Sequence, residues 1–315
     1  MTAPELSPWF GRTLANQVGE ALTVTNTDAV WEFGAGSGAL ALQLLDTLGD
    51  AVKRYTIVDL SGSLRARQQE TLKAYAHKVQ WVDALPEQLH GVVVGNEVLD
   101  AMPVQLLVRK AGVWHERGVV WHTPTEAGAS PLQWQDRVTD LRPPVEVEGT
   151  HDYLTEIHVQ AEAFIHTLAD RFKASLAATG QGGAAFLLDY GFPEHEYFHP
   201  QRHMGTLMCH QLHKSDPDPL QDVGAKDITA HVNFTGVALA GQDAGLEVLG
   251  YTSQAHFLIN CGLLPPLVDA PLAEKAMAQK LITEHEMGEL FKVIAFGTHA
   301  WEPIGFAQGD RSHTL

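Results

Sequence analysis

Apolar and polar positions alternate along the first hundred residues in a way typical of strands and helices that follow one another. Short apolar runs that suit buried strands are found at residues 29–33, 54–60, 79–82 and 91–95. After the first run, Leu40, Leu44 and Leu48 recur at helical spacing, and Gly49 predicts the end of that helix. This alternation predicts βαβ units, which build a parallel sheet covered by helices.

The pattern changes after Met102. Residues 104–121 are expected to form two strands joined at Ala111-Gly112, a hairpin inserted into the sheet. An amphipathic stretch that begins at Leu154 and stops at Gly180 predicts the best helix of the chain, and residues 184–191 predict a fifth buried strand.

The C-terminal part starts with residues 192–230, a segment dense in His, Pro and Asp that we expect to be a lid or binding loop. A helix over residues 233–245 and further helices between 254 and 290 are expected, with closing strands at 246–252 and 291–297. The predicted fold is therefore α/β, a Rossmann-like sheet of about seven mostly parallel strands. We expect one domain over residues 1–315, with insertions at about 104–150 and 192–290.

Composition limits the partners. Of 315 residues, 45% are apolar, and the net charge is −17. This charge repels a phosphate backbone and an anionic membrane surface, so we expect no nucleic acid partner and no membrane insertion. It favours the approach of a cationic ligand or a basic peptide, although acidic surfaces often serve only solubility.

Cysteine usage and the N-terminus indicate the compartment. Cys209 and Cys261 are the only cysteines, too few for a disulfide framework or a thiolate zinc site. The N-terminus lacks a basic segment followed by an apolar run, and no stretch reaches the roughly 18 apolar residues of a membrane span. We expect a cytoplasmic protein.

The first predicted strand ends in the sequence EFGAGSG, a glycine turn. Gly34, Gly36 and Gly38 allow the backbone to turn tightly and to approach a ligand closely. The turn also fits the dinucleotide pattern, since Ala39 follows at the right spacing, so the glycines alone do not separate a dehydrogenase from a methyltransferase. Glu32 favours the second class, because an acid suits a cationic sulfonium and repels a pyrophosphate.

The ends of the other strands carry further candidate residues. Asp59 lies 21 residues after Gly38, where a carboxylate can accept hydrogen bonds from a ribose diol. Asp83 is placed to meet an adenine edge, with a simple surface turn as an equal alternative. Asn96 ends the fourth strand, beside Glu97, and is a further candidate for cofactor binding.

Several motifs together resemble one family. TAPELSPWFG, EFGAGSG, GNEVLDAMPV, LLDYGF, GTLMCH and DITAHVNFTG occur in that order along nearly the whole chain. They resemble the MidA-like group of S-adenosylmethionine-dependent methyltransferases, whose mitochondrial member is an arginine methyltransferase needed for assembly of respiratory complex I. The resemblance implies S-adenosyl-L-methionine as cofactor, bound by the glycine turn and Asp59. It also implies an arginine acceptor in a protein, such as a respiratory complex subunit.

The chain departs from the family pattern in four ways. Asp59 stands where Glu is common, Asn233 where Asp is common, and the residues after GTL contain fewer arginines. Members usually carry several dozen residues before TAPE, so the chain is expected to start late within the family pattern.

Glu97 and Asp100 are the candidate catalytic residues. A guanidinium has a pKa above 12, so it needs a group that orients it and accepts a proton. Both carboxylates follow a strand at the predicted ligand-binding edge, where they are able to do this; the alternative is that Asp100 only caps a helix or turn.

Three other interpretations of the sequence are a metal site, a nicotinamide oxidoreductase and an assembly factor. The histidines crowded into one segment lack a metal-binding spacing, so we expect no metal site; they are His195, His199, His203, His210 and His213. A nicotinamide oxidoreductase is disfavoured by Glu32. The remaining alternative is an assembly factor that binds the cofactor weakly or not at all and acts through protein contacts.

Overall fold

The computed structural model describes residues 2–123, 130–211 and 214–315, and the chain falls into two compact units. The first unit contains residues 1–98, 164–190 and 238–315, and the second contains residues 99–163 and 191–237. That residues 1–315 form one domain stays a prediction.

The first unit is built on a sheet of seven strands in the order β14-β15-β9-β4-β1-β2-β3. Their bounds are β1 Ala29–Phe33, β2 Arg54–Val58, β3 Val79–Val82, β4 Gly91–Asn96, β9 Gly183–Phe192, β14 Glu247–Ser253 and β15 Phe291–Gly297. The five strands from β3 to β9 are parallel, whereas β15 runs antiparallel to both of its neighbours. This confirms the predicted α/β fold with a mostly parallel sheet, and every strand predicted for this sheet is present.

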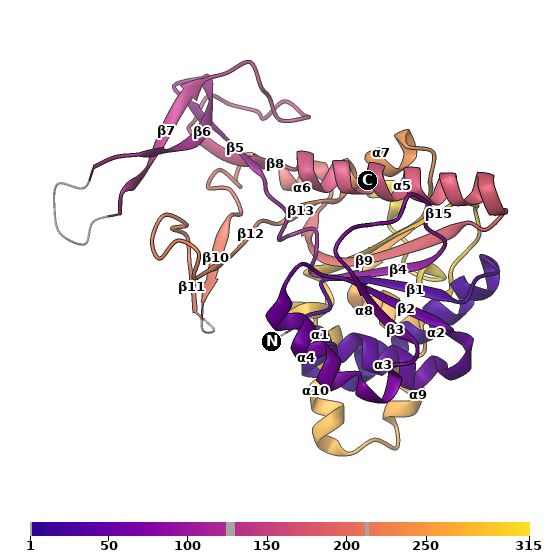
Figure 1. Ribbon diagram of the computed structural model, residues 1–315. Helices are drawn as coiled ribbons and strands as arrows, with labels where there is room; N and C mark the ends of the chain where they lie inside the picture. Colours follow the sequence, from indigo (N-terminus) through magenta and orange to yellow (C-terminus); the bar gives the residue numbers. More distant parts are fainter. Residues whose placement is uncertain (1, 124–129, 212–213) are drawn as a thin grey trace. The chain divides into compact units, whose positions relative to one another are not determined.

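Helices cover both faces of the sheet, with α5 on one side and α2 and α3 on the other (Figure 1). The bounds are α1 Ala3–Leu6, α2 Pro8–Val24, α3 Ala39–Leu48, α4 Gly62–Thr71, α5 Val159–Thr179, α7 Phe234–Asp243, α8 Gln254–Asn260, α9 Leu264–Leu267 and α10 Leu272–Ile282. Short helical turns are η1 Gly49–Ala51, η2 Lys73–Tyr75, η3 Glu284–Gly288, η4 Ile304–Phe306 and η5 Ser312–Thr314. Gly49 caps α3, as predicted, with a positive φ of 53°.

The core of the first unit is aliphatic and aromatic. Val92, Val94 and Phe186 on the strands are fully buried, and the ring of Phe186 lies 6.4 Å from that of Phe257 on α8. On the other face, a Cβ atom added to Gly183 would lie 2.1 Å from the ring of Phe172 on α5. This helix therefore packs so closely that β9 must begin with glycine.

The second unit consists of two small antiparallel sheets. One has the order β7-β6-β5-β8, and the other has the order β11-β10-β12. The bounds are β5 Gln105–Lys110, β6 Val113–Trp121, β7 Leu132–Val138, β8 Tyr153–Ile157, β10 Met208–Gln211, β11 Lys214–Asp216, β12 Asp227–Thr229, β13 Val232–Asn233 and α6 Glu194–Tyr197. β13 pairs with the last two residues of β9.

In this unit the predicted hairpin turn is present, whereas the predicted start of the long helix is not. The hairpin turn at Ala111-Gly112 is confirmed, with φ values of 48° and 79°, but the inserted sheet has four strands rather than two. The helix predicted to start at Leu154 begins instead at Val159, so that expectation was wrong. Residues 153–157 form β8 because they pair with β5 in an antiparallel ladder, a long-range contact that helical periodicity does not report.

Among the described residues, none of the helices is both long enough and apolar enough to cross a membrane.

Candidate active site

The glycine turn after β1 has the backbone that its sequence predicts. Gly34, Gly36 and Gly38 have φ values of 65°, 52° and 84°, in the left-handed region that side chains disfavour. Gly38 is also the N-cap residue of α3. A Cβ atom added to Gly36 would meet no atom within 4 Å, so the backbone here faces open space.

A hollow of about 70 Å³ adjoins the turn, within the first unit. The residues that line it are Thr2, Pro4, Glu5, Glu32, Gly34, Ala35, Gly36, Ser37, Ala39, Leu40 and Asn96. Four candidates from the sequence, Glu32, Gly34, Gly36 and Asn96, thus come together around one small space. Its size suits the charged end of a ligand rather than a whole nucleoside.

Glu32 supplies a carboxylate inside this hollow. It lies on β1 and is 2% exposed, and its Oε2 accepts a hydrogen bond of 2.7 Å from the Tyr55 hydroxyl on β2. Burial raises the pKa of Glu32 to about 7, and the bond from Tyr55 only partly opposes this rise. A cation placed in the hollow would favour the charged form, so this acid is suited to a positively charged ligand.

Asn96, the last residue of β4, supplies an unused acceptor. Its side-chain nitrogen donates to Glu97 Oε1 at 3.1 Å, and the residue is 7% exposed. Its Oδ1 is buried and has no hydrogen-bond partner among the residues that the structure describes. Because buried acceptors are almost always paired, this atom indicates a donor group on a ligand in the hollow.

Asp59, just after β2, does not line this hollow. Its two oxygens accept hydrogen bonds of 2.8 Å from the Ser61 backbone nitrogen and from Gln68 Nε2. A carboxylate has about four acceptor sites, so it retains the capacity to accept from a ribose diol. Two fixed donors hold it in place for that role.

Gln68, on α4, is a residue that sequence reasoning missed. It is fully buried, and its Nε2 donates both to Asp59 and to the Gly36 carbonyl at 3.1 Å. Its Oε1 accepts from Trp81 Nε1 at 2.9 Å. Gln68 thereby ties the glycine turn, the end of β2 and β3 together. A lone glutamine in a polar helix carries no sequence signal for this role.

Asp83, after β3, is exposed and pairs with Arg65 of α4. Arg65 also donates to the Asp59 carbonyl at 2.9 Å, so it connects the ends of β2 and β3. The structure places Asp83 at the expected edge of the sheet, with a cation already beside it.

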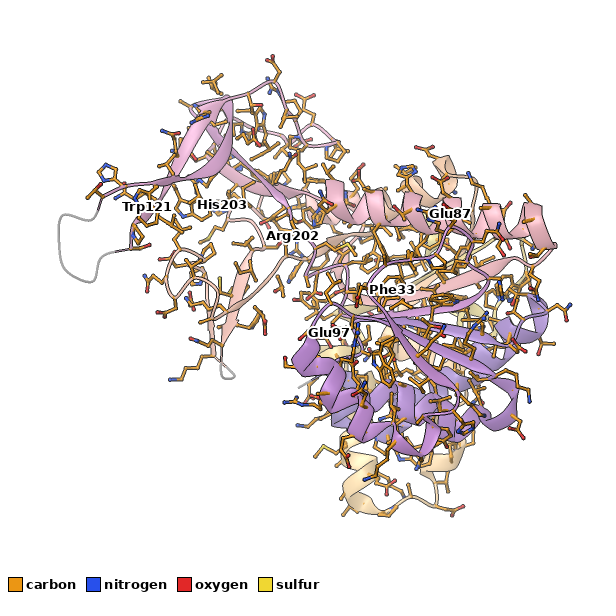
Figure 2. The ribbon with its side chains drawn as sticks, viewed as in Figure 1. Phe33, Glu87, Glu97, Trp121, Arg202 and His203 are labelled. Atoms are coloured by element: carbon orange, nitrogen blue, oxygen red, sulfur yellow. The ribbon has the colours of Figure 1, made fainter. Side chains whose placement is uncertain are left out.

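Glu97 follows β4 in a strained turn. Its φ of 53° is unusual for a residue with a side chain, and such strain is often found at functional sites. The turn is held by two hydrogen bonds, from the Glu97 nitrogen to the Leu188 carbonyl at 2.9 Å and from the Val98 nitrogen to Asp189 Oδ2 at 3.0 Å. Phe33 ends β1, and Glu97 directly follows the neighbouring strand β4 (Figure 2).

Asp100 belongs to the second unit, whereas Glu97 belongs to the first. Asp100 is 4% exposed, and its backbone carbonyl accepts a hydrogen bond of 2.9 Å from the Ala230 nitrogen. Each of these two candidate residues is therefore described within its own unit.

The histidine segment contains no metal cluster within the described residues, where no three His, Cys, Asp or Glu side chains are arranged to hold an ion. His213 lies outside the described residues. His199 and His203 instead make local contacts, with the Gln201 nitrogen at 3.2 Å and the Gln201 carbonyl at 3.4 Å respectively.

Three comparisons place the chain among known proteins. A family model described as "Putative S-adenosyl-L-methionine-dependent methyltransferase" matches residues 13–252. A crystal structure from Burkholderia thailandensis, bound to S-adenosyl-homocysteine, is 48% identical with a TM-score of 0.90, and the match covers 100% of this chain and 83% of that one. A native structure from the same organism is also 48% identical, with a TM-score of 0.89 and coverages of 100% and 86%.

A curated relative is more distant. It is the "Protein arginine methyltransferase NDUFAF7 homolog, mitochondrial" of Caenorhabditis elegans, 24% identical over 291 residues. The match covers 84% of this chain and 65% of the length of that relative.

The family model spans most of the chain, and the glycine turn, Glu32 and the unpartnered Asn96 oxygen fit the cationic end of this cofactor. The chain belongs to this family of S-adenosyl-L-methionine-dependent methyltransferases.

Proposed function

We propose that this methyltransferase transfers the methyl group to a guanidinium nitrogen of an arginine in a protein substrate. The observation that carries the proposal is the strained Glu97, which directly follows Asn96 of the cofactor hollow. The name of the distant relative, a protein arginine methyltransferase, supports the same acceptor.

Different residues are proposed to bind different parts of the cofactor. Glu32 and Asn96 take the ammonium end beside the glycine turn, and Asp59 takes the ribose hydroxyls. Asp83, with Arg65, lies where an adenine edge would be read. When bound, the cofactor supplies a methyl group on a positively charged sulfur.

Glu97 is proposed to act on the acceptor, and a catalytic role for Asp100, in the second unit, stays a prediction from the sequence. A carboxylate binds a guanidinium in a bidentate pair, which aims one nitrogen at the methyl carbon. As the new nitrogen–carbon bond forms and the carbon–sulfur bond breaks, the nitrogen gives up a proton, which the Glu97 carboxylate accepts. Positioning supplies most of the acceleration, because no new charge is created by the transfer.

The substitution Glu97→Gln tests this role. It keeps the shape and the bond from Asn96 but removes the base, so we expect methyl transfer to fall roughly 100- to 10,000-fold with cofactor affinity unchanged. Glu87→Gln is the matched control, because Glu87 is an exposed glutamate of the same unit (Figure 2). A near-normal rate for Glu97→Gln would remove Glu97 from the mechanism.

The acceptor is tested separately. Labelled S-adenosyl-L-methionine is incubated with purified protein and a lysate of cells that lack the gene, and the labelled amino acid is identified after hydrolysis. We expect methylarginine. Label on another residue would refute the arginine acceptor, and a folded protein that binds no cofactor in calorimetry would favour an assembly factor instead.

A further inference from the structure

A second hollow, of about 330 Å³, lies in the second unit and shares no residue with the glycine turn. Its size falls in the range of small-molecule pockets. It is lined by the connection between α6 and β10, by the first residue of β10 and by the residue before β13; among them are Arg202, His203, Met204, Thr206, Met208 and His231. Figure 2 shows Arg202 and His203 near one another in this unit.

Arg202 is the cation of this hollow. Its guanidinium carbon lies 3.7 Å from the ring centre of Phe192, so the planar group is held by stacking. Among the residues that the structure describes, no carboxylate forms an ion pair with it. Its charge is therefore not neutralised by an ion pair within the described part of the chain.

The buried carboxylate of Glu156 already accepts hydrogen bonds from its own neighbours in this unit. Glu156 on β8 is fully buried, and its Oε1 accepts from the nitrogens of Thr206 and Leu207 at 2.7 Å and 3.0 Å. Its Oε2 accepts from the hydroxyls of Tyr197 and Thr206 at 2.7 Å and 3.1 Å. These four bonds satisfy the carboxylate, so Arg202 remains available to an external anion.

His231 lines the same hollow with an imidazole ring. Its ring lies 5.4 Å from that of Phe192, the ring that also carries Arg202. Burial is the main cause that lowers the pKa of His231 to about 4; the charge of Arg202 acts in the same direction, and Glu156 opposes both. At neutral pH this imidazole is uncharged.

We infer that this hollow binds a carboxylate-bearing ligand, with the Arg202 guanidinium taking the carboxylate in a bidentate pair and Met204 and Met208 contacting its apolar part. Planar guanidinium and carboxylate match in geometry. One fixed positive charge balances one negative charge. A dianionic phosphate would instead leave excess negative charge in a protein of net charge −17, so a monocarboxylate is favoured.

The test follows the histidine side-chain signals of the ¹⁵N-labelled full chain by NMR, during titration with butyrate, with inorganic phosphate and with sodium chloride at matched ionic strength. We expect saturable shifts of the His203 and His231 signals with butyrate and smaller ones with phosphate. Shifts that rise linearly and match those of sodium chloride would overturn the site, and tighter binding of phosphate would overturn the choice of carboxylate.

Two variants sharpen the result. Arg202→Met keeps an apolar stem over Phe192 and removes the charge, so butyrate affinity should fall at least tenfold. Arg137→Met is the control, because Arg137 is exposed in the same unit and its guanidinium donates to Gln135, and this variant should bind butyrate normally. Arg202→Lys keeps the positive charge but removes the paired N–H donors of the guanidinium, so butyrate affinity should fall several-fold. Unchanged affinity would refute the bidentate pair.

Discussion

Two buried glutamates, one in each unit, are held in opposite ways. Glu156 of the second unit accepts four hydrogen bonds, two from backbone nitrogens and two from hydroxyls. Glu32 of the first unit accepts one, from Tyr55, and burial raises its pKa to about 7. Both side chains are almost completely excluded from solvent, at 0% and 2% exposure.

The difference separates a structural acid from a ligand-binding acid. The partners of Glu156 are all present in the chain, so this carboxylate holds β8 to the segment before β10. Glu32 lacks such compensation, and beside it Asn96 Oδ1 has no partner within the described part of the chain. A buried polar group is costly when unpaired, so the glycine turn carries a local cost that a cationic ligand relieves.

The largest effect is expected for Glu156→Ala. This substitution removes the acceptor of the buried Tyr197 hydroxyl and of the half-buried nitrogens of Thr206 and Leu207, so the free energy of unfolding should fall by about 3–5 kcal/mol. Urea denaturation measures it. The exposed Glu148→Ala is the control and should stay within about 0.5 kcal/mol of the parent. An equally small change for Glu156→Ala would end the distinction drawn between the two acids.

Glu32→Gln should act on the ligand rather than on the fold. Without the carboxylate we expect cofactor affinity, measured by calorimetry at pH 8, to fall about 10- to 100-fold, or roughly 1.4–2.7 kcal/mol. Affinity of the parent should rise with pH up to about 7, because Glu32 must lose its proton to pair with a cation, and the variant should lose this dependence. A parent affinity that is flat across this range would argue against Glu32 as the counter-ion.

The same acid also links stability to pH in the unliganded protein. The pKa of Glu32 is 4.5 in the unfolded chain and about 7 in the folded protein, so the folded protein binds this proton more tightly. The stability that the bound proton contributes is fully present below pH 4.5 and is lost as pH rises through about 7. Glu32→Gln should remove that part of the pH dependence of unfolding.

Asp59→Asn should have a smaller effect. In asparagine an NH₂ group replaces one carboxylate oxygen, so a donor would face either the Ser61 nitrogen or Gln68 Nε2, which are themselves donors. The remaining neutral oxygen accepts more weakly from a ribose hydroxyl than a carboxylate does. We expect cofactor affinity to fall about tenfold, or roughly 1.4 kcal/mol. Asp50→Asn, at a side chain that is 95% exposed, is the control and should bind normally.

The smallest effect separates backbone strain from contact with the ligand. Gly36 and Gly180, both in the first unit, have φ values of 52° and 75°, and a Cβ atom added to either meets nothing within 4 Å. Alanine at each position should cost about 1 kcal/mol of stability, measured by thermal unfolding. Only Gly36→Ala should also weaken cofactor binding, by several-fold, and equal affinities for the two variants would show that the ligand does not approach Gly36.

Much of the first unit could be predicted from the sequence, because local patterns dominate there. The strands at 29–33 and 79–82 have the predicted bounds, and α3 ends at Gly49 as its leucine spacing and glycine cap indicate. In the second unit the helix start at Leu154 was wrong, because residues 153–157 pair with β5 far along the chain.

The sequence indicated part of the candidate site, whose role in cofactor binding stays a prediction. It pointed to Glu32, Gly34, Gly36 and Asn96, which line one hollow, because the ends of parallel strands share one edge of a sheet. Gln68 was not identified, because its role depends on three partners contributed by separate elements.

The sequence by itself determined where chemistry is available, since glycine spacing and strand-end acids are local properties of the chain. Only the tertiary structure decided what each acid can do, because a carboxylate's charge and pKa depend on the partners that packing brings to it. Tyr55 gives Glu32 one hydrogen bond, whereas Glu156 receives four. That count of partners separates an acid suited to a cation from an acid that holds the fold together.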